Sequence, residues 1–415
     1  MEIKFQVRAS DFNATLDTVS VVTPRVVSPK GGAGYLCIVS ANQCYVYSRD
    51  GVHMSRANIE VEVEGEETSG SFIYPSDYVK GFKFLGDEMV TITATDSEGN
   101  HAVAYTTGSK ANVTHPTFDP QLITPIDKDF DDASNDRVYP VALLQEALKT
   151  ARSFVADSGD TNASEENRTI QLFDASKEEF KAGNGTLFAS NGLSACYFFT
   201  EAFKDKGLTI HAQTLRGVTE FLGGCESEVR IRTSNRSTFA VNEKGGVYGW
   251  GHQTKSYGKY SYYALDLDKV VLTVPVVVVL NALRYLESEM GKGSRKIKVE
   301  YSSKTKEITF RAADGGNKAT SFPVPAEVKE DNNEDVVFNA NIEHFLGLFS
   351  GAKGKEVQLR IFPHEGGAKG KPKTLVRTID EFILDKDGKL VGGSGGDKPE
   401  GSHPCLVTRF LVSMA

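Results

Sequence analysis

The sequence has little cysteine and no long run of apolar residues. Its five cysteines, Cys37, Cys44, Cys196, Cys225 and Cys405, are odd in number and form no CxxC pair, so neither a disulfide framework nor a zinc ribbon is indicated. The apolar run at Val276–Leu280 is far too short to span a bilayer, and MEIKFQVRAS lacks the apolar segment of a signal peptide. We therefore expect a cytoplasmic chain whose cysteines are buried free thiols.

Signatures of catalysis are also missing. The sequence contains no GxxxxGK[ST], HExxH or GxSxG motif, and its eight histidines show no metal-ligand spacing with cysteine. The stretch GAKGKE at 351–356 lacks the spacing and the hydroxyl residue of a phosphate loop. DKDGK at 385–389 lacks the later acidic ligand of a calcium loop and is typical of a hairpin tip. The sequence predicts a protein that is not an enzyme and holds no metal or cofactor.

The bulk composition sets the scale of the fold. With 415 residues, of which 40% are hydrophobic, the chain is long enough for two to four packed domains. The formal net charge of −8 excludes a uniformly basic surface, but it leaves room for a local positive surface facing nucleic acid. The distribution of charge therefore matters more than its sum.

One pattern recurs along the chain: a strand of about five residues, a turn or N-cap residue, and then a short amphipathic helix. The clearest copy is VYPVALLQEALKTARSFV at 138–155, where apolar residues recur every three or four positions and Lys149 and Arg152 lie on the polar side. The six copies begin at near-equal intervals, at Ile3, Ser71, Arg137, Gly207, Val270 and Asp335.

Strand-period segments separated by turn residues follow each helix, as in KIKVEYSSKTKEITFRAADGG. One unit is therefore a strand, a helix and three strands. A single short helix cannot cover such a sheet, so we expect the units to pair two by two around shared cores. This predicts an α+β fold of three tandem domains, at 1–125, 136–266 and 267–415, joined by 114–136 and 252–268, where the pattern lapses.

This organisation resembles that of the bacterial replicative sliding clamp, the beta subunit of DNA polymerase III, over the whole chain. FQVRASDFNATLDTVS is similar to the first strand and helix of that family, LFASNGLSACY to its central hairpin, and AQTLRGVTEFLGGCESEVRIRTSNRSTFAV to its second-domain helix and following strands. The insertions in the last third favour a divergent member, such as one encoded by a phage.

The resemblance implies that two chains close head to tail into a ring whose helices line a hole and whose sheets lie outside. Such a ring needs weak phosphate contacts on its inner wall rather than base readout. The candidate DNA-binding cations are Arg25, Lys30, Lys80, Lys83, Lys149, Arg152, Arg216, Arg284, Lys292, Arg295, Lys296 and Lys353. The alternative is that they are ordinary solvated helix faces, since acidic residues lie beside them.

The resemblance also implies a pocket between the second and third domains that takes a short apolar motif from polymerase, clamp loader and repair proteins. Its wall would comprise Ser190, Gly192, Leu193, Ala195, Tyr257, Phe410, Leu411, Val412, Ser413 and Met414. This chain has Gly192-Leu193-Ser194-Ala195 and Val412-Ser413-Met414 where family members carry a Gly-His-Arg-Leu run and a Met-Pro-Met-like tail. A plain edge strand is the alternative reading of the tail.

The ring joint would pair an edge strand of the first domain, near Val103 and Tyr105, with the first helix of the third domain around Tyr285 and Leu286. These residues are otherwise simple core. The leading hypothesis is a processivity clamp on double-stranded DNA that serves a DNA polymerase in the cytoplasm, at a nucleoid or viral replication site. A β-rich structural repeat protein without DNA binding is the alternative, and an enzyme with a site in the groove between the second and third domains is a third.

Overall fold

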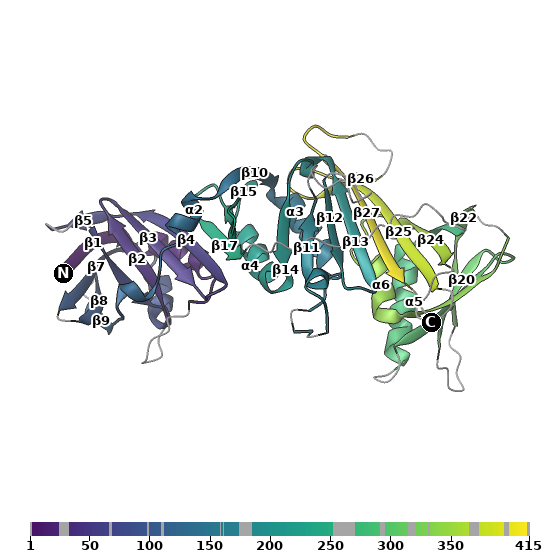
Figure 1. The fold of residues 1–415 in the computed structure, drawn as a ribbon, viewed down its shortest axis with the longest axis horizontal. Helices are drawn as coiled ribbons and strands as arrows, with labels where there is room; N and C mark the ends of the chain where they lie inside the picture. Colours follow the sequence, from purple (N-terminus) through teal and green to yellow (C-terminus); the bar gives the residue numbers. More distant parts are fainter. Residues whose placement is uncertain are drawn as a thin grey trace. The chain divides into compact units, whose positions relative to one another are not determined.

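The computed structural model describes residues 2–24, 33–65, 69–97, 99–108, 112–157, 159–160, 162–173, 185–251, 270–290, 295–313, 321–330, 333–364, 373–393 and 398–412. Within these ranges the chain is mostly antiparallel sheet with short helices (Figure 1). None of the described helices has the length and apolar character needed to cross a membrane.

The repeat predicted from the sequence is present as six strand–helix–strand units. The first two consist of β1 (Glu2–Arg8), α1 (Ala9–Val19), β2 (Gly34–Ser40), β3 (Gln43–Arg49) and β4 (His53–Glu60), and of β6 (Ser69–Pro75), η1 (Ser76–Phe84), β7 (Met89–Ser97), β8 (Asn100–Thr107) and β9 (Asn112–Pro116). The next two consist of β10 (Ser134–Pro140), α3 (Val141–Arg152), β11 (Thr169–Leu172), β12 (Thr186–Ser190) and β13 (Ser194–Thr200), and of β14 (Leu208–His211), α4 (Ala212–Gly223), β15 (Glu228–Thr233), β16 (Ser237–Val241) and β17 (Val247–Gly251). The last two consist of β18 (Val270–Pro275), α5 (Val276–Glu289), β19 (Lys296–Ser302), β20 (Glu307–Ala312) and β21 (Ser321–Pro325), and of β23 (Val336–Asn341), α6 (Ile342–Phe349), β24 (Glu356–His364), β25 (Lys373–Leu384) and β27 (His403–Val412).

Short elements fill the connections. They are β5 (Glu62–Glu64), η2 (Pro120–Leu122), α2 (Asp127–Asp131), η3 (Glu166–Arg168), η4 (Glu201–Phe203), β22 (Glu327–Glu330) and β26 (Leu390–Gly393). The segment 114–136, expected as a joint, thus contains the end of β9 and the start of β10. Proline and aspartate break its sequence pattern without preventing strand formation at its two ends.

Neighbouring units are paired by exchange of their first strands. β1 joins the sheet of β7, β8 and β9, whereas β6 joins the sheet of β2, β3 and β4. The same exchange places β10 beside β15 and β14 beside β11, and again β18 beside β24 and β23 beside β19. Each helix therefore connects strands of two sheets. In the first and the last pair of repeat units the helices lie on a core that both repeat units share, as expected from the inability of one short helix to cover a sheet.

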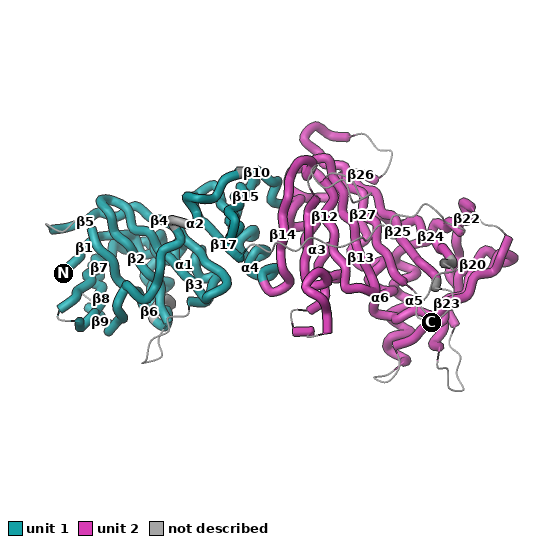
Figure 2. Tube along the Cα trace, viewed as in Figure 1, with its two compact units in different colours: residues 1–141, 214–253 teal, residues 142–213, 254–415 magenta. Residues whose placement is uncertain are grey.

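Two further pairings extend the sheets. β17 pairs with β4 and so builds an eight-stranded sheet, and β13 pairs with β27 and so builds a ten-stranded sheet. In both cases the joining strands are the last long strands of their units. The chain separates into two compact units, residues 1–141 with 214–253 and residues 142–213 with 254–415 (Figure 2). This division follows the continuous sheets, and the three-domain boundaries stay a prediction.

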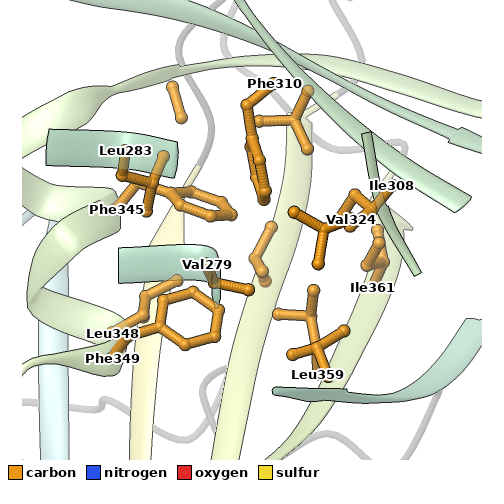
Figure 3. Packing of buried hydrophobic residues seen from close by; sticks show 14 of the residues in the cluster. Val279, Leu283, Ile308, Phe310, Val324, Phe345, Leu348, Phe349, Leu359 and Ile361 are labelled. Atoms are coloured by element: carbon orange, nitrogen blue, oxygen red, sulfur yellow. The ribbon is translucent and has the colours of Figure 1, made fainter. Parts of the chain in front are cut away.

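The largest described core lies under α5 and α6. Val279 and Leu283 of α5 meet Phe345, Leu348 and Phe349 of α6 over strands that contribute Phe310, Leu359 and Ile361 (Figure 3). These residues recur at helical spacing in the sequence, so one face of each helix is apolar and becomes buried. The contacts hold the helices on one face of the sheets and leave their polar faces outward.

The second helix differs from the prediction in type. Residues 76–84 form the 3₁₀ helix η1 rather than an α-helix. Gly81 interrupts this segment, and aromatic and β-branched residues make up much of the rest, so α-helix propensity is low over a span of little more than two turns.

Candidate nucleic-acid interface and partner sites

Three of the predicted DNA-binding cations are exposed on helix faces opposite the core. Lys149 and Arg152 lie on the last turn of α3, whose Leu144 and Leu148 are buried, and Arg284 lies on α5. Within the described residues no carboxylate lies in ion-pair reach of these three side chains. Their charges are therefore available to an external anion, and a cation in the last helical turn is favoured by the helix dipole.

Three other candidate cations are exposed but paired. Lys83 lies 3.3 Å from Asp17, Arg216 lies 2.8 Å from Glu220, and Arg295 lies 3.3 Å from Glu287 and also meets Glu343. Solvent-exposed pairs of this kind contribute only about 0 to 1 kcal/mol, so they do not prevent exchange for a phosphate. Lys296 opens β19 and is half-buried.

Lys353 occupies a different environment from the one expected. Its ammonium lies 3.0 Å from the Glu146 carboxylate of α3, and their side chains are only 24% and 13% exposed. The loop past the end of α6 folds back onto α3, and a contact of Lys353 with DNA stays a prediction. This ion pair ties α3 to the loop between α6 and β24.

Several predicted residues lie outside the described residues. They are Arg25, Lys30, Tyr257, Lys292, Ser413 and Met414, and the side chain of Lys80 belongs with them. Their proposed contacts with DNA or a partner peptide stay predictions.

The two segments predicted to form the partner pocket lie side by side. β13 pairs with β27, so that Ala195 faces Phe410 and Ser194 faces Leu411, and the Val412 amide donates to the Leu193 carbonyl at 3.0 Å. The hairpin between β12 and β13 is tightly specified. Gly192 has a positive φ of 89°, and a Cβ there would meet the Asn167 amide nitrogen at 2.9 Å, so this position requires glycine.

The two faces of this junction differ. Ala195 and Phe410 belong to an aromatic cluster with Phe173, Phe188 and Tyr197, next to the exposed Leu193. Leu411 points to the other side, into the core beneath α5 and α6. The expectation that Phe410 and Leu411 line the same pocket is therefore corrected, because successive strand residues face opposite sides of a sheet.

A buried ion pair underlies the same junction. Arg409 of β27 is fully buried, its guanidinium lies 3.7 Å from the Asp380 carboxylate of β25, and it donates no hydrogen bond to any described residue. Asp380 also accepts hydrogen bonds from the amides of Lys353 and Gly354 at 2.9 and 3.2 Å. Asp380 thus links β27 to the loop that Lys353 fixes to α3.

The cysteines of this region are poor nucleophiles. Burial raises the pKa of Cys196 to about 12, and burial together with the negative charge of Glu146 raises the pKa of Cys405 to about 12. Both thiols are therefore protonated at neutral pH, as expected from buried free cysteine. Among the described residues no group of histidine, cysteine and carboxylate side chains could hold a metal ion.

The β4–β17 junction contains an Asp–His–Thr arrangement. His53 Nδ1 lies 3.0 Å from Asp50, and its Nε2 lies 3.1 Å from the Thr214 hydroxyl of α4. Burial alone would raise the pKa of the Asp50 carboxyl. Hydrogen bonds from His53 and the Val52 amide outweigh this effect, so the pKa of Asp50 lies below its usual value. Thr214 is only 2% exposed, so its hydroxyl is shielded from a substrate, and the arrangement fixes α4 to the turn before β4.

The predicted ring-joint residues fall in two classes. Val103 and Leu286 are buried in the cores of their own sheets, whereas Tyr285 is half exposed and packs edge-on against Phe322 of β21. Val103 and Tyr105 lie on β8, which has β7 on one side and β9 on the other. The expectation of an edge strand at β8 is thus corrected: β9 occupies the edge.

Sequence reasoning missed two exposed apolar features. Phe84 at the end of η1 is 88% exposed, and Val277 and Val278 at the start of α5 are 64% and 43% exposed. The run of four valines at 276–279 predicts that some of them are exposed, because one helix face cannot bury four consecutive residues. These side chains lie on the helices beside the β8–β9 and β20–β21 hairpins.

The arrangement has close counterparts among solved structures. The DNA polymerase III subunit beta of Pseudomonas aeruginosa matches with a TM-score of 0.74 at 13% identity, over 99% of each chain. The beta sliding clamp of C. crescentus matches at 0.73 and 12% identity, over 100% of this chain and 99% of that one. The beta subunit of Thermotoga maritima matches at 0.68 and 14%, over 100% and 99%. No protein-family model and no curated protein matches the sequence.

The chain therefore has the sliding-clamp fold, built from repeated domains of paired strand–helix–three-strand units. More specifically, it is the fold of the beta subunit of DNA polymerase III, at a sequence identity of 12 to 14%. The resemblance predicted from the sequence and the predicted α+β class are confirmed.

Proposed function

We propose that this chain is a non-enzymatic processivity factor: two copies close head to tail into a ring around duplex DNA and tether a DNA polymerase to it. The observation that carries the proposal is the match to sliding clamps over the full length of both chains. The fold supplies six equivalent units per chain, and two chains supply the twelve helices that such a ring needs.

The wall facing DNA would be formed by the polar faces of the helices. Lys149, Arg152 and Arg284 are exposed cations on those faces, and Lys83, Arg216 and Arg295 are exposed cations in weak pairs. A small number of cations among many carboxylates suits a ring that slides along DNA. Phosphate contacts are independent of base sequence, and strong contacts would hold the ring in one place. Arg25, Lys30, Lys80 and Lys292 would add to this wall.

The partner site would lie where β13 meets β27. The exposed Leu193 beside the glycine turn at Gly192 would offer the apolar contact for a short extended peptide from a polymerase or clamp loader, and the buried aromatic cluster around Phe410 would support the strands beneath it. Tyr257, Ser413 and Met414 would complete it. The protein would act in the cytoplasm at a nucleoid or a viral replication site.

Topology gives the decisive test. The protein is placed with its loader on a nicked circular plasmid, and one aliquot of the complexes is then linearised by a restriction enzyme before a high-salt wash. A ring should stay on the circle and slide off the linear ends. Equal retention on both forms would contradict encirclement, and no binding to either would favour a structural repeat protein.

A further inference from the structure

Arg409 of β27 is a buried charge without a hydrogen bond. Its guanidinium is fully buried, lies 3.7 Å from the Asp380 carboxylate, and donates to no described residue. Buried polar groups in proteins are almost always hydrogen-bonded, and a buried charge is the most costly group to leave without a hydrogen bond. An arrangement in which Arg409 donates to Asp380 should therefore lie close in free energy to the observed one.

The loop after α6 occupies both oxygens of Asp380. The Lys353 amide donates to Oδ2 at 2.9 Å, and the Gly354 amide donates to Oδ1 at 3.2 Å. Arg409 approaches Oδ2, the oxygen that already accepts from the Lys353 amide. The loop and Arg409 thus compete for one carboxylate, and a small displacement of the loop would free Asp380 to accept from Arg409.

An ion pair with α3 holds this loop in place. The Lys353 ammonium lies 3.0 Å from the Glu146 carboxylate, and both side chains keep some exposure, 24% and 13%. Lys149 follows Glu146 by three residues on α3, so the two are neighbours on the helix surface, and Lys149 is exposed. A phosphate held by Lys149 therefore brings a negative charge that competes with Glu146 for the ammonium of Lys353.

We propose that Lys353 is a switch between two arrangements of the β13–β27 junction and that duplex DNA on α3 sets this switch. In the first arrangement Lys353 pairs with Glu146, and its loop holds Asp380. In the second, Lys353 pairs with a DNA phosphate, the loop amides leave Asp380, and Asp380 accepts a hydrogen bond from Arg409. This inference rests on the proposed function, which places α3 against DNA.

The switch reaches the proposed partner surface through β27. Arg409 is paired with Cys196 of β13, and the Val412 amide donates to the carbonyl of the exposed Leu193. A hydrogen bond from Arg409 to Asp380 ties β27 more firmly to β25 and so stabilises the ladder next to Leu193. DNA on α3 should thus favour a peptide that binds this ladder, and the peptide should favour DNA by the same factor, because linkage is reciprocal.

The switch needs only a local movement. Every residue involved belongs to the compact unit of residues 142–213 with 254–415 (Figure 2). The second arrangement loses a partly exposed ion pair and two backbone hydrogen bonds to Asp380. It gains a phosphate contact and a charge-assisted hydrogen bond in a buried site. Gains and losses of this kind are similar in size, so DNA can shift the balance between the two arrangements.

The test is amide hydrogen exchange of the full chain, read by mass spectrometry at low salt with and without a short linear DNA duplex. We expect two segments to change in opposite directions. Peptides of the loop 350–355 should exchange about 5-fold faster or more, because the Lys353 and Gly354 amides lose their acceptor. Peptides of β13 and β27 should slow by a similar factor. Simple shielding by DNA would slow both segments.

Two variants separate the switch from DNA binding as such. E146Q removes the charge that holds Lys353, so both segments should shift in these directions without DNA and respond little to its addition. K353Q keeps the two amides at Asp380 but cannot follow a phosphate, so neither segment should respond to DNA. E220Q, which removes an exposed carboxylate from a helix pair on α4, is the matched control and should keep the wild-type response.

The outcomes distinguish the switch from the clamp function. Opposite changes in the wild type that are lost in K353Q and kept in E220Q support the switch. Segments that slow together, segments that do not respond to bound DNA, or an E146Q chain with wild-type exchange would overturn the switch and leave the clamp function standing. A chain that binds no duplex at any salt concentration and is lost equally from circular and linear DNA contradicts the clamp function itself.

Discussion

Replacing Asp380, the buried ion-pair partner of Arg409, is the most demanding test of what stabilises the β13–β27 junction. In D380N one carboxylate oxygen becomes an NH2 group, so the side chain accepts from only one of the Lys353 and Gly354 amides. The Arg409 charge also loses its counter-charge in a fully buried site. Removing one partner of a buried ion pair costs about 3 to 5 kcal/mol. We expect the lower end, about 3 kcal/mol, because a 3.7 Å separation is long and the guanidinium makes no hydrogen bond to a described residue.

Amide hydrogen exchange read by mass spectrometry measures this locally. A loss of about 3 kcal/mol accelerates exchange on the order of 100-fold where closing is faster than exchange. The acceleration should be confined to peptides of β25, β27 and β13 and of the loop that contains Lys353 and Gly354. Peptides of β1 and β7 belong to the other compact unit and serve as internal references. D387N, at an exposed turn, removes the same charge without burial and should leave exchange unchanged.

A double-mutant cycle completes the experiment. R409M should also destabilise the junction, but D380N/R409M should cost less than the sum of the single changes by at least about 1 kcal/mol, because no charge is then left alone. Additive effects, or an acceleration in D380N below about fivefold, would place the pair among ordinary surface ion pairs and refute this reasoning.

Four further predictions follow from the surface and the turns. K149A, R152A and R284A should each reduce the slope of log affinity against log salt on linear duplex DNA by about 1, whereas K244A, an exposed lysine on a β-turn, should leave it unchanged. F84S should weaken self-association about tenfold or more, since a Phe side chain contributes about 1.5 to 3 kcal/mol when buried, and L122S is the control at another exposed apolar residue. G192A should lower the free energy of unfolding by roughly 1 kcal/mol or more, through its positive φ and the contact with Asn167. Burial opposes the shift at Glu243, but amides of Glu228, Ser227 and Glu226 donate to its carboxylate and lower its pKa from 4.5 to about 2. Because the pKa of Glu243 is lower in the folded state than in the unfolded state, its stabilisation is present above pH 4.5 and is lost as the pH falls toward 2. E243Q should lower the free energy of unfolding in urea by about 1 kcal/mol at pH 7, a figure reduced for the exposure of the side chain, and by less below pH 4.5.

The repeat and its helices could be predicted because each unit carries its own signal. Apolar residues at helical spacing, such as Leu144 and Leu148 of α3, mark a buried face that the structure confirms. The exchange of first strands could not be predicted. The alternation along β1 shows that one face is buried, but it carries no information on whether β2 or β7 is the neighbour.

The candidate sites were predictable only in part, for physical reasons. Exposure of Lys149 follows from helical periodicity, whereas the pairing of Lys353 with Glu146 depends on a loop that packs against a helix far away in sequence. The edge strands β9 and β21 were missed because Pro116, Pro323 and Pro325 interrupt their patterns. A proline whose missing N–H points outward is compatible with a strand, but sequence alone does not say which way it points.

The exchange of first strands has a consequence during synthesis on the ribosome. β1 emerges early and has only the three-residue strand β5 to pair with until β7 has been made, and β13 stays without its β27 neighbour for much longer. Nascent chains thus expose unpaired strands for many seconds, which invites aggregation and gives chaperones a target. A message truncated before β27 would yield a product with both β13 and β25 open, so quality control could recognise incomplete copies before they reach DNA.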